Sequence, residues 1–242
     1  MDSNPISPFG KALLACYLGD EEATVIIRRD DGVEAPLPMK YFFRSENEFS
    51  EIEKKVIAMC KGKILDVGAG SGIHSLALQK SGFEVTSIDV SQEAVEVMKL
   101  RGILDVRMAD IFSFTVGRYD TLLLLGHGIG MMNDLQGLGK FLMVADTLLN
   151  PDGQILLDTL DVRITDDAGN LAYQKANADA GRYFGKIRFR MEFNGETGPY
   201  VSWLHVDAET LISSAEKYNW KCEILLNTAF GDYLARLTKK NR

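Results

Sequence analysis

The ten residues from Lys63 to Gly72, KILDVGAGSG, constrain the fold of this chain more than any other segment. An apolar run, Ile64, Leu65 and Val67, passes directly into a glycine-rich turn, and a second segment, EVTSID, ends at Asp89. A strand, a tight glycine turn, a helix and a second strand closed by a carboxylate form half of a nucleotide-binding site. The turn exposes backbone N–H groups, and the carboxylate accepts hydrogen bonds from ribose hydroxyls.

Size and charge exclude several classes of protein. The 242 residues suit one large domain or one domain with a modest elaboration, and 46% of them are hydrophobic, as in ordinary globular proteins. The net charge of −7 gives no electrostatic basis for binding nucleic acid. No window approaches about 20 consecutive apolar residues, so we expect no membrane span. The first residues also lack the basic region of a signal peptide.

The cysteines indicate the compartment. Cys16, Cys60 and Cys222 lie far apart and are odd in number. This usage is typical of reduced thiols and not of a disulfide framework. We therefore expect a cytoplasmic protein with three free cysteines.

From residue 63 onward, strand and helix patterns alternate along the chain. Strands are predicted at 63–67, 84–89, 104–108, 119–125 and 154–160, and helices at 72–81, 91–101 and 134–149. The sequence Asn-Pro-Asp-Gly at 150–153 predicts a helix stop and a turn. A helix at 207–218 precedes two strands, 221–228 and 232–238, which we expect to be antiparallel. Connections of this kind yield an open, doubly wound α/β sheet.

Two segments differ from this alternation. Residues 1–60 predict a helix at 7–19, a strand at 23–29 and a helix at 47–60, with Pro36 and Pro38 interrupting the chain between them. We interpret them as an N-terminal appendage packed on a core domain formed by residues 61–242. Residues 165–206 contain KIRFRMEF and YVSWLHV around Asn194-Gly195, which predicts a β-hairpin inserted in that domain.

Four features of the chain together resemble the class I S-adenosylmethionine-dependent methyltransferases. They are the glycine motif from Asp66 to Gly72, Asp89 in SIDVS, Asp110 in MADIF, and the segment LLNPDGQILLD. The resemblance covers roughly residues 55–160 and the last thirty residues. It implies a mostly parallel seven-stranded sheet of order 3-2-1-4-5-7-6, with strand 7 antiparallel and helices on both faces.

The resemblance also implies which residues hold S-adenosyl-L-methionine and its product, S-adenosyl-L-homocysteine. The glycines of the motif would pass under the methionine part of the cofactor, and Asp66 would help to hold its amino group. Asp89 would bind the ribose, Asp110 the adenine amino group, and Ile111 the adenine ring. The loop after the fourth core strand would face the transferring methyl group. The implied binding residues are Asp66, Gly68, Ala69, Gly70, Asp89, Val90, Asp110, Ile111, Leu125 and Gly126.

Two other functions remain open. A nicotinamide-dependent dehydrogenase has the fingerprint GxGxxG, but the glycines here follow GxGxG and Ile73 stands in the place of the third glycine. No Tyr-x-x-x-Lys pair is present either. A non-catalytic partner protein that binds the same cofactor also fits. Methyl transfer requires mainly alignment of the reacting groups and leaves little signature in the sequence.

Histidines and carboxylates provide the candidate catalytic groups. His127, in the loop LGHGIG, lies near the predicted reaction centre, and its ordinary pKa suits a general base. The alternative is that His127 orders the loop. His74 would point toward the cofactor carboxylate or solvent, and His205 would line the substrate pocket or pack structurally. The carboxylates after the fifth core strand would be solvated and bind no metal; they are Asp158, Asp161, Asp166 and Asp167.

The sequence therefore predicts a methyltransferase that acts on a small molecule by proximity-driven displacement. We expect no nucleic-acid partner and no membrane association. Arg188 and Arg190 share one strand face, where they would either grip an anionic group or form a solvated surface. The methyl acceptor and the oligomeric state stay open.

Overall fold

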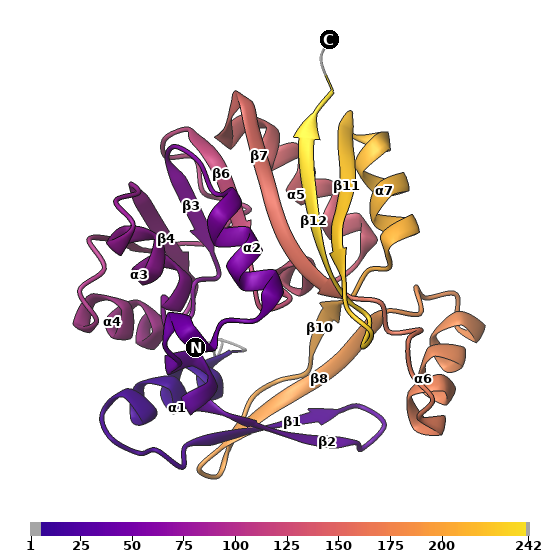
Figure 1. The fold of residues 1–242 in the computed structure, drawn as a ribbon. Coiled ribbons are helices and arrows are strands. Elements are labelled where there is room, and N and C mark those ends of the chain that lie inside the picture. The colour runs from indigo at the N-terminus through magenta and orange to yellow at the C-terminus, as the bar shows by residue number, and fades with distance from the viewer. Residues whose placement is uncertain (1–5, 241–242) are drawn as a thin grey trace.

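A computed structural model describes residues 6–240, which contain a larger and a smaller β-sheet (Figure 1). The larger sheet has the order β5-β4-β3-β6-β7-β12-β11. Its strands are β3 (Ile64–Val67), β4 (Val85–Asp89), β5 (Asp105–Met108), β6 (Tyr119–Leu124), β7 (Leu149–Leu160), β11 (Trp220–Asn227) and β12 (Asp232–Lys239). β12 is antiparallel to both of its neighbours, whereas β3 to β7 are parallel. The predicted order and the antiparallel strand are confirmed.

Both faces of this sheet are covered, which explains the apolar runs in its central strands. Successive side chains of a strand point to opposite faces. Leu122 and Leu124 of β6 therefore join one cluster with α5 (Leu135–Leu148) and α7 (Ala208–Lys217). Leu123 joins another with α2 (Glu51–Met59) and α3 (Ile73–Lys80). A strand buried in this way is rich in apolar residues, and a polar side chain within it, such as that of Thr121, is buried as well.

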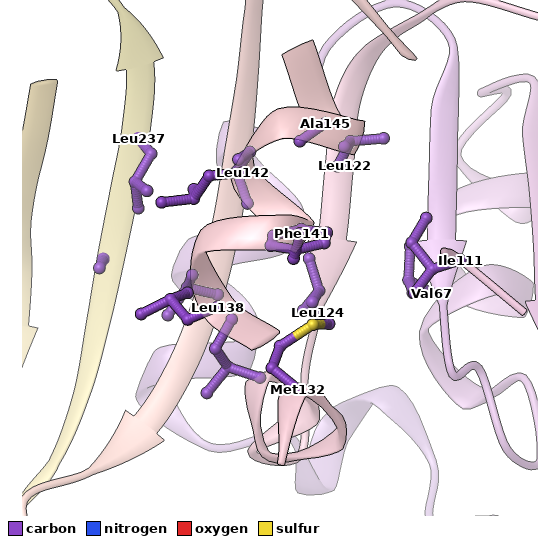
Figure 2. Close-up of a cluster of buried hydrophobic side chains, with 14 of the residues drawn as sticks. Val67, Ile111, Leu122, Leu124, Met132, Leu138, Phe141, Leu142, Ala145 and Leu237 are labelled. Carbon is purple, nitrogen blue, oxygen red and sulfur yellow. The ribbon is translucent and has the colours of Figure 1, made fainter. Parts of the chain in front are cut away.

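Helix α5 presents a continuous apolar stripe to the sheet. Leu138, Phe141, Leu142 and Ala145 recur at the spacing of one helix face, and none is exposed to solvent. Figure 2 shows these side chains beside Leu122 and Leu124 of the sheet and Leu237 of β12. The helix begins where the carboxylate of Asp134 accepts the N–H groups of Gln136 and Gly137.

The smaller sheet joins the two segments that interrupt the alternating pattern. Its order is β10-β8-β1-β2, with β9 (Glu196–Thr197) paired to β8, and all pairs are antiparallel. β1 (Thr24–Arg29) and β2 (Glu34–Pro38) come from the first 60 residues, and β8 (Lys186–Phe193) and β10 (Val201–Leu204) come from the predicted hairpin. Helix α1 (Ser7–Tyr17) packs on this sheet through Leu13, and on α4 (Gln92–Leu100) of the core through Ala94. The smaller sheet is therefore fixed to the core near the end of β4.

Three sequence predictions need correction. β2 was missed because Pro36 and Pro38 read as breakers, but prolines are tolerated on an edge strand. Helix α6 (Ala168–Asp179) was also missed, because only Asn177 of its residues is buried and it has no apolar stripe. The turn at 150–153 is wrong as well, since β7 begins at Leu149, with a shift of register against β6.

The remaining short elements lead into the carboxyl edge of the larger sheet, where its parallel strands end. They are the 3-10 helices η1 (Met39–Phe43), η2 (Glu46–Glu48) and η3 (Gly128–Met132). η3 follows β6 directly, and β10 of the smaller sheet lies against it. None of the helices among residues 6–240 is long and apolar enough to cross a membrane.

Candidate active site

The glycine turn after β3 is tied to the end of β4. The N–H groups of Gly68 and Ala69 donate to the carbonyl of Ile88, at 2.9 and 3.0 Å. Gly68 and Gly70 have φ angles of +69° and +58°, which side chains other than glycine rarely tolerate. A Cβ added to Gly70 would meet no atom within 4 Å, so this part of the turn has an open side that a ligand can approach.

Asp89 lies at the end of β4 and holds this turn. Its Oδ2 accepts the N–H of Gly70 at 2.9 Å, and its Oδ1 accepts the N–H of Ser91 at 2.8 Å. Only 7% of the residue is exposed, and burial raises the pKa of its carboxyl group. Two carboxylate oxygens have about four acceptor positions. The backbone N–H groups of Ser91, Gly70 and Val90 take up three of these positions, so Asp89 orients the turn and keeps about one position for a ligand.

Asp110 and Ile111 follow β5, beside Asp89. The N–H of Ala109 donates to the carbonyl of Asp89 at 2.9 Å, which joins the two strand ends. Asp110 is exposed, and its Oδ1 accepts the N–H of Phe112 at 2.9 Å. Ile111 is buried and lies beside Val67 in the core (Figure 2). Ile111 thus forms the apolar floor under this strand end.

The other implied cofactor residues occupy three kinds of position. Val90 is 45% exposed beside Asp89, and Ala69 packs against the apolar residues of α4. Leu125 is buried, whereas Gly126 is exposed, and a Cβ there would meet no atom within 4 Å. Asp66 is buried below the turn, where it accepts the hydroxyl of Ser75 at 2.5 Å.

The sequence predicted that His74 points toward the cofactor carboxylate or solvent. Its side chain is only 13% exposed and pairs with Glu53 instead of pointing to solvent. Its Nε2 lies 2.8 Å from Oε1 of Glu53, the same oxygen that accepts a hydrogen bond from Arg44 at 2.5 Å. Glu53 also completes a capping box with Ser50 at the start of α2. These contacts lower the pKa of Glu53 to about 2, although burial opposes the shift. His74 therefore fastens α3 to the first turn of α2.

His127 is held by two carboxylates beyond β6. Its backbone has φ +58°, a conformation that costs energy in a residue other than glycine. The backbone N–H donates to Oδ1 of Asp158 at 3.1 Å, and the ring Nε2 lies 2.8 Å from Oδ1 of Asp232. Burial alone lowers the pKa of His127, but the hydrogen bond to Asp232 and the charge of Asp158 outweigh burial and raise it.

Asp232 and the full role of Asp158 were not identified from the sequence. Asp232 begins the antiparallel strand β12, so it lies at the same edge as the ends of the parallel strands. The available signal was the reversed direction of this strand, which places its first residue opposite Leu160, at the end of β7. Asp158 was considered only as a possible metal ligand.

Trp203 of β10 and His205, the residue directly after β10, also lie against this loop. The ring of His205 lies 5.4 Å from that of His127, at an angle of 82°. Its Nδ1 is buried and has no hydrogen-bond partner among residues 6–240. A Cβ on Gly130 would lie 1.8 Å from Nε1 of Trp203, so Gly130 permits the indole to pack on η3. The smaller sheet thus forms one wall of the site.

The charge state of His205 predicts acid sensitivity. Burial lowers its pKa to about 3, whereas an unfolded histidine titrates near 6.5. The unfolded chain therefore binds a proton that the folded chain does not bind, and the free energy of unfolding falls as the pH drops from about 6.5 toward 3. We expect His205→Asn to flatten the decrease of the melting temperature between pH 7 and pH 5.

His127→Asn provides a control of opposite sign. A raised folded pKa contributes stability below pH 6.5 that is lost as the pH rises through that pKa. The His127→Asn variant should therefore show a steeper decrease of the melting temperature toward acid pH than the wild type, in the same series of thermal melts. Equal slopes in the wild type and the His205→Asn variant would contradict the prediction.

The carboxylates near the end of β7 each contact a different partner. Asp161 binds Arg163 at 2.8 Å, Asp167 accepts the N–H of Asn170 at the start of α6, and Asp158 contacts His127. No group of three potential ligands suited to a metal ion occurs within the described range. The guanidinium groups of Arg188 and Arg190 lie over the ring of Tyr200, 5.0 and 5.3 Å from its centroid.

Comparisons with known proteins agree with this arrangement. The sequence profile of a methyltransferase domain family matches residues 43–223. The crystal structure of a SAM-dependent methyltransferase from Bacteroides fragilis, in complex with S-adenosyl-L-homocysteine, is 36% identical in sequence. The match covers 97% of this chain and 95% of that chain, with a TM-score of 0.85. The chain therefore belongs to the methyltransferase domain family, and its sheet is that of the class I S-adenosylmethionine-dependent methyltransferases.

Two curated relatives match over shorter segments. Glycine/sarcosine N-methyltransferase of Halorhodospira halochloris is 33% identical over 125 residues, 48% of this chain and 45% of that protein. Ubiquinone biosynthesis O-methyltransferase of Xanthomonas euvesicatoria is 27% identical over 139 residues, 54% of each chain. The chain thus spans about half the length of the curated relatives it matches. These relatives differ in the atom that they methylate.

Proposed function

We propose that this protein transfers the methyl group of S-adenosyl-L-methionine to a small-molecule acceptor and releases S-adenosyl-L-homocysteine. The observation that carries the proposal is the arrangement of three neighbouring strand ends. The turn after β3, Asp89 after β4 and Asp110 after β5 are joined through Gly70 and Ala109. In this class of fold, ligands bind at the carboxyl ends of the strands.

Each strand end suits one part of the adenosyl donor. The open side of Gly70 admits the methionine part, and Asp66 supports the turn from below through Ser75. Asp89, at the end of β4, accepts a hydrogen bond from the ribose, and Val90 lies beside it. The free oxygen of Asp110 accepts the adenine amino group above Ile111. Leu125 and Gly126 lead to the reaction centre at His127.

The proposed acceptor is small and not a nucleic acid. A net charge of −7 opposes the approach of a phosphate backbone, although one curated relative from Pyrococcus abyssi is a 23S rRNA methyltransferase. The three cysteines are unpaired, which suits a reducing compartment, and we propose a cytoplasmic location. The order of the strands, with an antiparallel strand between two others, also disfavours a nicotinamide-dependent dehydrogenase.

Calorimetry and turnover together test this function. We expect both S-adenosyl-L-methionine and S-adenosyl-L-homocysteine to bind with one site per chain, and NAD not to compete. An assay for release of S-adenosyl-L-homocysteine across a metabolite panel then separates an enzyme from a binding protein. Binding without turnover would support the non-catalytic alternative, and absence of binding would defeat the proposal.

A further inference from the structure

We propose that the methyl acceptor is a primary or secondary amine that binds as its ammonium ion against Asp158, and that His127, held by Asp232, removes the ammonium proton. The inference rests on the proposed methyl-transfer function and names its substrate class. It is carried by three side chains from three neighbouring strands: His127 beyond β6, Asp158 in β7 and Asp232 in β12.

The position of this cluster matches that of an acceptor. A donor that spans the ends of β5, β4 and β3 occupies one half of the carboxyl edge. Its methyl group must be attacked from the side opposite the sulfur. The next strands along the sheet are β6, β7 and β12, and they carry the cluster. Trp203 of β10 and His205, the residue after Leu204, cover the same half.

Asp158 has an oxygen available to a ligand. The residue is only 9% exposed, and its Oδ1 accepts the N–H of His127. Its Oδ2 receives no hydrogen bond from any residue between 6 and 240, and the nearest cationic atom, Nε2 of His127, is 3.8 Å away. A largely buried carboxylate in this state is stabilised by a donor from a ligand. An ammonium group supplies both the donor and the opposite charge.

The charges around the reaction centre favour a cation over an anion. In the described part of the chain, the ion pairs of Asp158 and Asp232 are with His127 alone. Arg44 forms an ion pair with Glu53, and its guanidinium carbon lies 3.7 Å from the centroid of the Tyr41 ring.

The other titratable groups that face this centre do not change the sign of its charge. Glu53 and His74 form their own pair, His205 is held neutral by burial, and Tyr41 is uncharged. Two carboxylates and one imidazole therefore set a negative local charge. An acceptor with a carboxylate or phosphate next to its nucleophile would be repelled, whereas an ammonium ion is attracted even beside the positive sulfonium of the donor.

The hydrogen bonds of His127 define the path of the proton. An ionised carboxylate only accepts, so Nε2 carries the hydrogen shared with Asp232, and Nδ1 of the neutral ring is an acceptor. The ammonium nitrogen gives one proton to Nδ1, and its lone pair then forms a bond to the methyl carbon. The carbon–sulfur bond breaks, and its electron pair stays on sulfur as a neutral thioether. The product is the methylated ammonium ion, and His127 passes its proton to water.

Matched acceptor pairs test the substrate class. The wild-type protein is incubated with S-adenosyl-L-methionine and with benzylamine or benzyl alcohol, cyclohexylamine or cyclohexanol, and glucosamine or glucose. Methylation is followed by mass spectrometry, and binding to the protein loaded with S-adenosyl-L-homocysteine by calorimetry. We expect amines and not their hydroxyl counterparts to bind and to be methylated. The proposal is overturned if only hydroxyl compounds react, or if no amine in the panel binds.

Two substitutions assign the roles. Asp158→Asn should raise the KM for the amine about 10–100-fold, the loss expected for a charge-assisted hydrogen bond, with unchanged affinity for S-adenosyl-L-homocysteine. Asp161→Asn, three residues further along the chain, is the matched control and should leave KM unchanged. If Asp158→Asn instead weakens only S-adenosyl-L-methionine, Asp158 serves the sulfonium and the proposal is wrong.

Asp232 is a positioning residue, and the pH profile reports its effect. Because Asp232 raises the pKa of His127, Asp232→Asn should shift the acid limb of kcat/KM toward lower pH. A merely structural role would lower activity without moving that limb, and this result would contradict the assignment. Calorimetry with S-adenosyl-L-homocysteine separates failure of this inference from failure of the proposed function, since only the latter abolishes that binding.

Discussion

Replacing Asp89 with alanine is expected to weaken S-adenosyl-L-homocysteine binding by roughly 100-fold or more. A hydrogen bond to a charged group contributes about 1.5–3 kcal/mol, and Asp89 is proposed to accept one from the ribose. The substitution also releases the N–H of Gly70, so the turn loses the contact that orients it. Isothermal titration calorimetry with purified wild-type and variant proteins measures the difference directly.

Asp105→Ala is the matched control for this experiment. Asp105 begins β5 at the opposite edge of the sheet, where its carboxylate binds Thr86 and Arg107. Its removal should leave the affinity within about twofold, because its contacts lie at the start of β5 and not at the strand ends proposed to hold the ligand. A folded Asp89→Ala variant that binds as tightly as the wild type would disprove the ribose assignment. Circular dichroism of both variants establishes that they are folded.

Phe141→Ala should produce the largest loss of stability. The ring is fully buried between α5 and the sheet, beside Leu124 and Leu138 (Figure 2). Removal of a buried phenylalanine side chain typically costs about 3–5 kcal/mol, because transfer free energy is lost and a cavity remains. Unfolding in urea should therefore show a lower midpoint with a similar slope.

Met143→Ala, on the opposite side of the same helix, separates burial from helix formation. Met143 is 53% exposed, and its replacement should change stability by about 0.5 kcal/mol or less. If Phe141→Ala and Met143→Ala have equal effects, the stripe on α5 is not the main contact between this helix and the sheet.

Much of the core was predictable because its strands carry unmistakable patterns. Parallel strands covered on both faces are rich in apolar residues, as at Leu122–Leu125, and Asp89 and Asp110 stand at or just after the ends of such strands. Asp89 and Asp110 could be assigned to one edge for this reason. Their precise contacts could not, because the hydrogen bond from Gly70 depends on turn angles that glycine leaves open.

The unpredicted parts depend on pairing between distant segments. β1 and β8 pair through Ile27 and Met191. The local sequence of a strand does not indicate which distant strand will pair with its edge. The contact of His127 with Asp232 has the same origin, since it joins residues that are neighbours only after β12 inserts beside β7. Helix α6 was hidden for a different reason, since a helix with one buried residue has no periodic signal.

The pairing of β1 with β8 has a consequence for biosynthesis. A ribosome that has released the first sixty residues has produced β1 and β2, which pair with each other, but β8, the second partner of β1, is still more than a hundred residues from being made. The wall that carries Trp203 and His205 can close only after most of the polypeptide has emerged. One edge of β1 therefore stays unpaired for much of translation, and the wall beside His127 forms late.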